Sequence, residues 1–334
     1  MNRRQFLQAL GAAGVAALGA GLVGCSSPST PPGRDGFTVG LTYTPDIQFA
    51  PFYVAVEQGY FADAGLDVAL RHHGANEQLF GAIQAGQEDL VYAGGAEFMQ
   101  ARAQGIALVS VATYYQQYPV AMIVAEDSPI RGAADLAGCS VGVPGPYGET
   151  WFGLLALLKQ AGLTEEDVRV EHIGYTQQAA LAAGRVDAVM GYVNNDAVRL
   201  QEAGVAVRTV PITDGTPPLV GVGLGTTDEV LAAHAPALRT LQEAVARATA
   251  DIVADPEAAV TMSQRHIPGL NADEQRRSAL ATLQATIPLF GDVDTFGRQN
   301  TDTWQQMAGF LAEMDLLPGA VDAEECYSTE IVPE

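Results

Sequence analysis

Aromatic, amide and acidic side chains gather in the loops that follow the apolar runs of this sequence. Such a set suits a flat heteroaromatic molecule, because rings stack on the faces of the molecule while amides and acids pair with its edge. We expect stacking from Phe49, Tyr115, Tyr147, Trp151 and Tyr192. We expect polar contacts from Asp46, Gln48, Asn76, Glu97, Asn195 and Asp196.

Several of these residues also have a purely structural interpretation. Glu97 opens a predicted helix, where the helix dipole favours an acid with or without a ligand. Trp151 falls on the apolar face of a helix and could belong to the core. Tyr115 lies near Tyr114 and Tyr118, and any of the three could pack at a hinge instead of facing a ligand. Both interpretations stay open for each residue.

Motifs for metal binding and catalysis give little support to an enzyme. The sequence has no His-Glu-x-x-His motif and no cysteine cluster. His72 and His73 are adjacent, and adjacent positions on a strand point to opposite faces, so they cannot chelate one ion together. The glycine-rich loop 145–151 could cradle a phosphate or sulfonate, but it lacks the lysine and spacing of a Walker motif. We therefore predict no cofactor, no metal site and no enzymatic activity.

Short apolar runs alternate with amphipathic segments, a pattern that indicates repeated βα units on mainly parallel sheets. A first cycle begins at residue 37, and a second begins at residue 140. The later helices add no third cycle, and the simplest packing returns them to the first lobe. We predict an α/β fold with lobe 1 at residues 37–125 and 212–334, lobe 2 at residues 126–211, and hinge crossovers near Ala125 and Pro211.

The N-terminal residues resemble an export signal. Arg3 and Arg4 precede an apolar stretch, residues 9–23, which is shorter than the roughly 20 residues that a spanning helix needs. The small residues before Cys25 resemble a lipobox, in which the cysteine carries lipid chains that hold the protein at the membrane surface. We predict a signal peptide with lipidated Cys25 over residues 1–25 and a flexible tether over residues 26–36. The twin arginine favours the twin-arginine export route, although the general secretory route also accepts arginines. An uncleaved N-terminal anchor helix is the alternative to a signal peptide.

Charge and cysteine content limit the partners and the crosslinks. The formal net charge of −22 would repel a phosphate backbone, so we predict no binding to nucleic acid. Besides Cys25 the chain has Cys139 and Cys326. They could form a disulfide in an oxidising compartment, or they could be two separate buried thiols.

Several strings resemble one family of binding proteins, which comprises substrate-binding proteins for nitrate, sulfonates, riboflavin and thiamine-pyrimidine precursors. The same family contains a fungal pyrimidine synthase. The resemblance extends from residue 37 to about residue 211. The strings that carry it are Gly59-Tyr60-Phe61, Gly65-Leu66-Asp67-Val68, Gln84-Ala85-Gly86, Ala134-Asp135-Leu136-Ala137-Gly138 and Gly184-Arg185-Val186-Asp187-Ala188.

This resemblance implies a type II periplasmic binding protein fold and a role as the substrate-binding component of an ABC importer. The protein is then expected at the extracytoplasmic face of the cell membrane, as a monomer. Its expected partners are a small-molecule ligand, an ABC permease and, through the lipid anchor, the membrane. An exported enzyme of the same fold is the other class, but the cysteine-rich iron-binding stretch of the fungal synthase has no counterpart here.

The loops 143–148 and 191–196 look most like those of riboflavin-type and pyrimidine-type binders. Members of these groups often have Glu where this chain has Asp196, an acid that is shorter by one methylene. We therefore expect riboflavin or a related flat heterocycle first and a thiamine-pyrimidine precursor second. A sulfonate or nitrate ranks third, because no arginine lies in the proposed loops.

Overall fold

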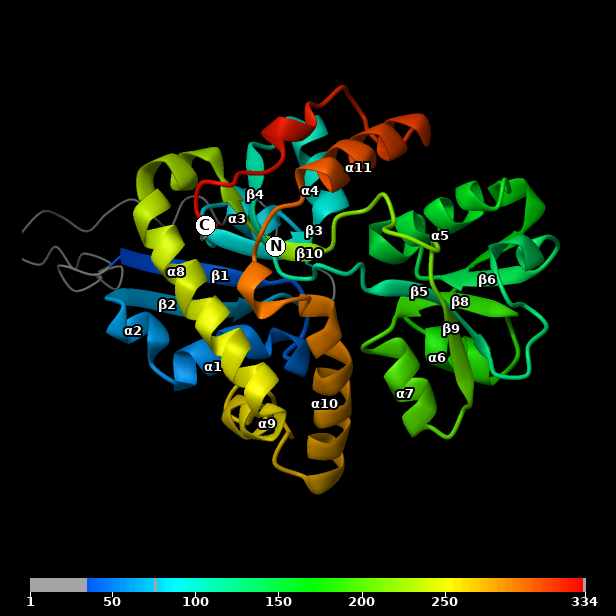
Figure 1. The fold of residues 1–334 in the computed structure, drawn as a ribbon, viewed down its shortest axis with the longest axis horizontal. Helices are drawn as coiled ribbons and strands as arrows, with labels where there is room; N and C mark the ends of the chain where they lie inside the picture. The colour runs from blue at the N-terminus through cyan, green and yellow to red at the C-terminus, as the bar shows by residue number, and fades with distance from the viewer. Residues whose placement is uncertain (1–34, 75–76, 333–334) are drawn as a thin grey trace, which may run out of the picture. The chain divides into compact units, whose positions relative to one another are not determined.

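The computed structural model describes residues 35–74 and 77–332, in which the strands form two five-stranded sheets (Figure 1). The first sheet has the order β2-β1-β3-β10-β4, and the second has the order β7-β6-β8-β5-β9. The strands of the first sheet are β1 (Asp35–Leu41), β2 (Leu66–His72), β3 (Leu90–Gly94), β4 (Leu108–Thr113) and β10 (Val222–Thr227). Those of the second are β5 (Val120–Ala125), β6 (Ser140–Val143), β7 (Arg169–His172), β8 (Ala188–Tyr192) and β9 (Val207–Val210).

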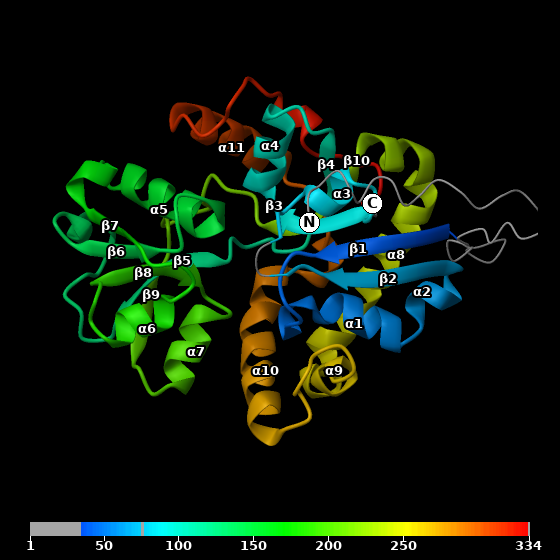
Figure 2. The ribbon, with the colours of Figure 1, turned by 180° about the vertical axis from the view of Figure 1, so that it is seen from behind.

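Helices flank both sheets, as Figure 2 shows from behind. The helices of the first lobe are α1 (Ala50–Glu57), α2 (Tyr60–Asp63), α3 (Gly81–Gln84), α4 (Gly95–Ala103), α8 (Asp228–Ala254), α9 (Pro256–Ser263), α10 (Asp273–Thr286) and α11 (Thr301–Glu313). Those of the second lobe are α5 (Gly148–Gln160), α6 (Gln177–Ala182) and α7 (Asp196–Glu202). Short 3-10 segments are η1 (Ile47–Phe49), η2 (Ala133–Leu136), η3 (Glu165–Asp167), η4 (Ile287–Phe290), η5 (Val293–Thr295) and η6 (Ala323–Glu325).

Both sheets are mixed and follow one plan. In the first, β1 pairs in parallel with β2 and β3, while β10 runs antiparallel to β3 and β4. In the second, β6 pairs in parallel with β7 and β8, while β5 runs antiparallel to β8 and β9. The expected two-lobed α/β fold is confirmed, but the sheets are not mainly parallel. Strands β5 and β10 are the antiparallel strands, and each directly follows a crossover between the lobes. The crossover reverses the direction of the strand relative to the strands of the βα units.

The first crossover lies earlier in the chain than expected. Strand β5 pairs with β8 and β9, so the chain has already entered the second sheet at Val120 and the crossover runs through residues 114–119. The expected crossover near Ala125 assigned this strand to the first lobe. The run Val120–Ala125 is apolar throughout, and periodicity does not say which sheet such a strand joins. The second crossover runs through residues 211–221, after β9 ends.

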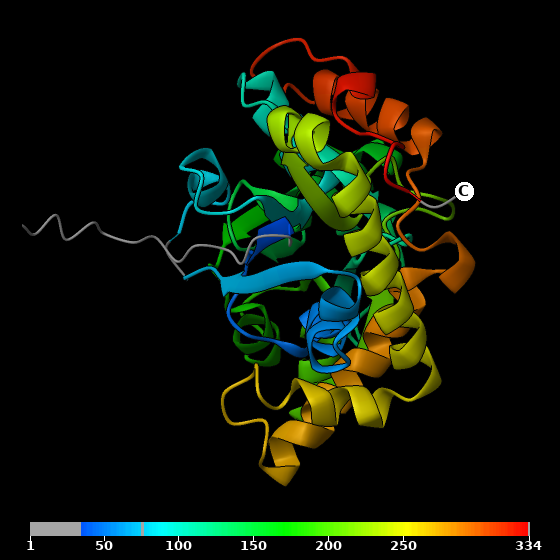
Figure 3. The ribbon, with the colours of Figure 1, turned by 90° about the vertical axis from the view of Figure 1, so that its left-hand side faces the viewer.

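The C-terminal helices pack on the first lobe. Helices α8 and α9 contact α1, and α11 contacts α4; Figure 3 shows α8 running alongside α1. Helix α8 leaves helical geometry at His234 (φ −130°), two residues before Pro236, because proline lacks an N–H and clashes with the preceding turn. Trp304 of α11 is fully buried and stacks on Tyr327 at a ring distance of 5.4 Å, which ties down the C-terminal segment.

Cys139 and Cys326 are both free thiols. Cys139 precedes β6 of the second sheet, whereas Cys326 is buried beside β4 of the first, where its carbonyl accepts from the N–H of Ser110 at 2.9 Å. The thiols donate to the carbonyls of Asp135 and Asp322 respectively. The two cysteines therefore belong to different lobes and do not form the disulfide that the sequence left open.

Some sequence predictions fall outside the described residues. These are the signal peptide, lipidated Cys25, nearly all of the tether, and Asn76. Within residues 35–74 and 77–332, none of the helices combines the length and the apolar character that crossing a bilayer requires.

Replacing Gly223 of β10 with Ala is expected to lower the free energy of unfolding by about 1–3 kcal/mol, because overpacking forces backbone shifts. A Cβ at this position would lie 2.0 Å from the carbonyl oxygen of Ala112 on the neighbouring strand. Urea unfolding followed by circular dichroism measures the change. The matched control is Gly309→Ala in α11, where a Cβ meets open space and the change should be neutral or stabilising. Equal midpoints for the two variants would contradict the packing argument.

Candidate functional site

The two lobes meet where loops at the ends of β1, β3, β6 and β8 converge. Both lobes belong to one compact unit, residues 33–334. Helix α4 starts here in the first lobe and α5 in the second. A Cβ on Gly94 would lie 1.9 Å from Oε1 of Glu149, so glycine is what allows the two helix starts to approach this closely. We call this region the junction, and it comprises residues 43–46, 94–97, 118, 147–149, 175–178 and 192–199.

An ion pair crosses the junction. Arg199 on α7 places Nη2 3.3 Å from Oδ2 of Asp46 in the loop after β1. Oδ1 of Asp46 also accepts from the N–H of Gln48 at 3.2 Å and thereby caps η1. Burial raises the pKa of Asp46, and the Gln48 N–H and the Arg199 charge act against that rise. The Asp46 carboxylate thus already has partners and links the lobes.

A buried amide makes a second link between the lobes. Nδ2 of Asn194 donates to Oγ1 of Thr286 at 2.9 Å and to the hydroxyl of Tyr115 at 3.5 Å. The Asn194 side chain is fully buried, whereas Asn195 is half-buried and gives no side-chain cap to α7. The sequence analysis named Asn195 as a polar contact, but the amide that reaches the first lobe belongs to the neighbouring residue, Asn194.

Two carboxyl groups face each other at the starts of α4 and α5. Oε2 of Glu97 accepts from the N–H of Gly94 at 2.8 Å, and its Oε1 points toward Gly148 of the second lobe. Glu149 is only 4% exposed, and within the described residues neither carboxyl oxygen of Glu149 has a hydrogen-bond partner. Burial raises the pKa of Glu97. Burial and the charge of Glu97 raise the pKa of Glu149 to about 8.

Four tyrosines surround these acids, of which Tyr92 and Tyr115 are buried and Tyr118 and Tyr192 are half-buried. The hydroxyl of Tyr118 donates to the backbone carbonyl of Glu149 at 2.8 Å. Burial, and then the charge of Glu149, raise the pKa values of Tyr118 and Tyr192. Burial likewise raises the pKa values of Tyr92 and Tyr115, whose hydroxyls interact with each other. These four phenols keep their protons at neutral pH and offer ring faces and hydroxyl groups to a neighbour.

Three exposed tyrosines lie on loops at the same ends of the sheets. Tyr43 (46% exposed) follows β1, Tyr147 (52%) precedes α5, and Tyr175 (74%) follows β7. Burial raises the pKa of Tyr175, and the charge of Tyr147 and a hydrogen bond with it add to the rise. The Tyr147 ring lies over Gly145, where a Cβ would be 2.4 Å from the ring. Exposed aromatic rings cost hydrophobic free energy, so three in one place favour a binding role.

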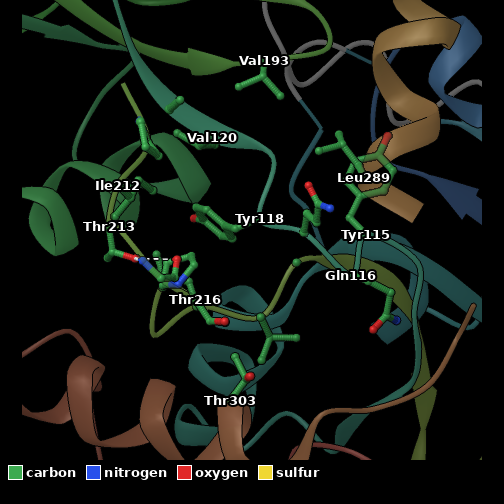
Figure 4. Close-up of a pocket in the computed structure, with 18 of the residues that line it drawn as sticks. Tyr115, Gln116, Tyr118, Val120, Val193, Ile212, Thr213, Thr216, Leu289 and Thr303 are labelled. Atoms are coloured by element: carbon green, nitrogen blue, oxygen red, sulfur yellow. Dashed lines mark hydrogen bonds between the residues drawn. The ribbon is translucent and has the colours of Figure 1, made fainter. Parts of the chain in front are cut away.

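A cavity of about 460 Å³ lies on the hinge side of the junction (Figure 4). Both crossovers line it, and Figure 4 shows Tyr118 between Ile212 and Thr213 on one side and Tyr115 and Leu289 on the other. Its volume falls in the range of about 300–1,000 Å³ that is usual for small-molecule pockets. Among the lining residues that the structure describes, none is acidic or basic. The cavity therefore supplies space and ring surface, while the junction supplies charge.

The predicted site residues are distributed between the junction, the hinge and the cores. Asp46, Glu97, Tyr147, Tyr192, Asn195 and Asp196 lie at the junction. Asp196 accepts from the N–H of Tyr192 at 2.9 Å, and burial raises its pKa. Tyr115 is the predicted residue that lines the cavity. Gln48 is half-buried in the loop behind Asp46. Phe49 and Trp151 are buried in hydrophobic cores, with Phe49 edge-on to His72 at 5.5 Å and Trp151 edge-on to His172 at 6.4 Å.

Four residues at the junction were missed by the sequence analysis of the site. They are Tyr43, Glu149, Tyr175 and Asn194. Tyr118 was considered there only as a neighbour of Tyr115. Glu149 lies inside the glycine-rich loop 145–151, so its position in the first turn of a helix was visible. What the sequence did not show was its burial, because that depends on the first lobe packing against it.

Residues 138–142 have the sequence Gly-x-Ser-x-Gly, the pattern of a hydrolase nucleophile. The search of the sequence for catalytic motifs overlooked it. In such enzymes the serine sits on a sharp turn between a strand and a helix. Here Ser140 starts strand β6 and is 6% exposed. Its hydroxyl donates to Oδ2 of Asp187 at 2.6 Å and accepts from the N–H of Asp187 at 2.9 Å. The serine therefore joins β6 to the loop before β8 and does not form a nucleophile elbow.

A second polar cluster lies near the end of β2. Ligand atoms of His73, Glu77 and Glu88 all lie within 4.8 Å of one another. Arg71 contacts both carboxylates at 2.6 Å, and His73 lies 2.9 Å from Glu88. A guanidinium already neutralises the two acids, so this arrangement is an ion-pair network. His73 is 5% exposed and lies on the buried side of this network.

Comparisons with known proteins agree with this architecture. The family model described as "NMT1/THI5 like" matches residues 46–259. The riboflavin-binding protein RibY of Chloroflexus aurantiacus is 31% identical over 316 residues, which are 92% of this chain and 89% of RibY. The formylaminopyrimidine-binding protein of Halalkalibacterium halodurans is 26% identical, over 87% of this chain and 89% of that protein. The periplasmic aliphatic sulphonate binding protein SsuA of Escherichia coli shares the fold, with a TM-score of 0.69, 17% identity and coverage of 87% and 91%.

Replacing Glu149 with Gln is expected to make the protein more stable at alkaline pH. The pKa of this acid is raised in the folded protein, so its stabilising contribution is complete below its ordinary pKa of 4.5 and is lost as pH rises toward 8. We expect Glu149→Gln to have a higher Tm than the wild type near pH 9 and a similar Tm near pH 5, as measured by thermal unfolding.

The control for this prediction is Glu166→Gln, which removes an exposed acid of η3. It changes the net charge by the same amount and should leave the pH dependence of Tm unaltered. A Glu149→Gln variant whose Tm follows that of the wild type at every pH would show that the pKa of this carboxyl group is the same in the folded and the unfolded protein.

Proposed function

The chain belongs to the NMT1/THI5-like family, and we propose that it is the extracytoplasmic substrate-binding component of an ABC importer. The fold shared with SsuA and the similarity to RibY over most of both chains support this role. A junction at which side chains of both lobes meet supports it as well. In such a binder, the ligand holds the two lobes together, and a membrane partner can recognise the lobes in that arrangement.

We propose riboflavin, or a closely related flat heterocycle, as the ligand. The observation that carries this proposal is the concentration of ring surfaces at one place. Tyr43, Tyr147 and Tyr175 are exposed on loops of the two lobes, and Tyr115 and Tyr118 line the cavity behind them. Aromatic rings hold a planar molecule by stacking on its faces. The similarity to RibY, which is named for binding riboflavin, supports the same ligand.

A thiamine-pyrimidine precursor is the second candidate ligand, supported by the similarity to the formylaminopyrimidine-binding protein. A sulfonate or nitrate ranks third, although SsuA shares the fold. The junction contains the acids Asp46, Glu97, Glu149 and Asp196, and Arg199 is already paired with Asp46. An anion would therefore meet carboxyl groups, and the arginine at the junction is already engaged by Asp46.

We propose that the protein binds its ligand without converting it. RibY and the formylaminopyrimidine-binding protein, which match 92% and 87% of the chain, are both named as binding proteins. An exported enzyme is the alternative class, because the family resembled by the sequence contains a pyrimidine synthase. Absence of turnover together with tight binding would exclude that class.

Export and membrane attachment complete the proposed role. A signal peptide over residues 1–25 would direct export, and lipid on Cys25 would keep a monomeric binder beside its permease. Export and lipid attachment are supported by the amino-acid pattern of the N-terminal residues alone.

Titration of riboflavin with the purified protein is expected to quench flavin fluorescence at micromolar concentrations, because the flavin ring would stack on tyrosine. Unchanged emission would remove riboflavin as the ligand. Chromatography of the mixture after long incubation separates binding from turnover: unaltered riboflavin is expected, and a new product would favour the enzyme.

Replacing Tyr147 with Ala is expected to weaken riboflavin binding by about tenfold, the size expected for one lost aromatic contact. Tyr147→Phe keeps the ring and should bind nearly as well. The matched control is Val253→Ala, which removes another exposed apolar side chain, on α8 and away from the junction. The same fluorescence titration measures all three, and an unchanged affinity of Tyr147→Ala would count against stacking on this ring.

A further inference from the structure

We propose that Glu149 selects the ligand. Its carboxyl group forms hydrogen bonds with N–H or O–H groups of an uncharged heterocycle, and it disfavours the phosphorylated form of the same molecule. This inference rests on the proposed function and deepens it, because it names the chemical class that the binding site accepts.

The first argument is the combination of burial and missing partners. Glu149 is 4% exposed, and both of its carboxyl oxygens lack a hydrogen-bond partner within the described residues. A buried polar group without a partner destabilises a protein. Such a group is kept where a ligand or a reaction uses it. The position of Glu149, against Gly94 of the other lobe, is between the two halves that a ligand would hold together.

A helix-capping role does not account for this residue. Acids in the first turn of a helix are common because the dipole and the free N–H groups favour them. Glu97 fits that explanation, since its carboxylate accepts from the N–H of Gly94 at 2.8 Å. Glu149 is the second residue of α5 but accepts from no N–H in the described part of the chain. Its pKa is raised by burial and by Glu97, which is opposite to the effect of a helix dipole.

The second argument is the charge around the carboxyl group. The titratable groups that face it are Glu97 from α4, Tyr118 from the first crossover and Tyr192 from the end of β8. No cation acts on it among the residues that the structure describes. Free N–H groups at the starts of α4 and α5 would otherwise favour an anion. The carboxyl groups of Glu97 and Glu149 occupy that place instead, so the site favours N–H and O–H donors and leaves these N–H groups unavailable to phosphate or sulfonate.

The phenols beside Glu149 fit the same ligand class. The hydroxyl of Tyr118 is fixed by its bond to the Glu149 carbonyl, which orients the ring that lines the cavity. A heterocycle stacked on such a ring presents its edge, and carboxyl oxygens are strong acceptors for N–H and O–H groups on that edge. Recognition of the edge is what distinguishes heterocycles of similar size.

The test uses riboflavin and riboflavin 5′-phosphate, titrated against the wild type, Glu149→Gln and the control Glu166→Gln. The wild type and the control should both bind riboflavin at least about a hundredfold more tightly than the phosphate. Glu149→Gln should lose at least about tenfold in riboflavin affinity and should narrow the preference over the phosphate. Unchanged affinity and preference in Glu149→Gln would overturn the inference and leave the proposed function standing.

A second variant tests the inference if Glu149→Gln does not fold, and a second pair of ligands tests it if the wild type does not bind riboflavin. If Glu149→Gln does not fold, Glu149→Asp carries the test, because it keeps the carboxyl group and shortens its reach. Weaker riboflavin binding with the phosphate still rejected supports the inference, and wild-type behaviour overturns it.

If the wild type binds no riboflavin, the proposed ligand fails. The same comparison is then made with a hydroxymethyl aminopyrimidine and its phosphate, where a preference that depends on Glu149 supports the inference. Binding of neither pyrimidine, or tight binding of an alkanesulfonate, overturns it.

Discussion

The close approach of the starts of α4 and α5 is the constraint on which the rest of the site depends. Glu149 packs against Gly94, where any larger residue would collide with its carboxyl group. This contact removes Glu149 from water, and burial beside Glu97 is what raises its pKa. The same contact brings the loops of both lobes together, so that tyrosines from separate sheets surround one place. Without it, Glu149 would be an ordinary solvated acid at the start of a helix.

The topology explains why the hinge and the junction are coupled. Each crossover leads directly into the antiparallel strand of the sheet that it enters, β5 in the second and β10 in the first. Movement of one sheet relative to the other must therefore be absorbed in residues 114–119 and 211–221. Tyr115 and Tyr118 lie in the first of these segments, line the cavity and contact junction residues through Asn194 and Glu149. A ligand near these rings would act on the hinge as well as on the lobes.

The charge of the junction depends on its side chains and not on the fold that this protein shares with others. SsuA, named for a sulphonate ligand, has a similar backbone at 17% identity. A shared fold does not define a ligand, because recognition depends on the side chains grafted onto it. Here the side chains between the lobes are acids and tyrosines, and the arginine that reaches them is paired with Asp46. The ligand that we propose for this chain therefore differs in chemical character from the sulphonate for which SsuA is named.

The sequence by itself was sufficient for the alternation of strands and helices, the two lobes and the family, because these follow from local periodicity and short strings. It also pointed to loop 145–151 and to residues 192–196 as parts of the site. Only the tertiary structure decided that Val120–Ala125 joins the second sheet, that Asn194 and not Asn195 reaches the first lobe, and that Glu149 is buried without a partner. Strand pairing, side-chain direction and desolvation all depend on residues distant in the chain, and no local pattern encodes them.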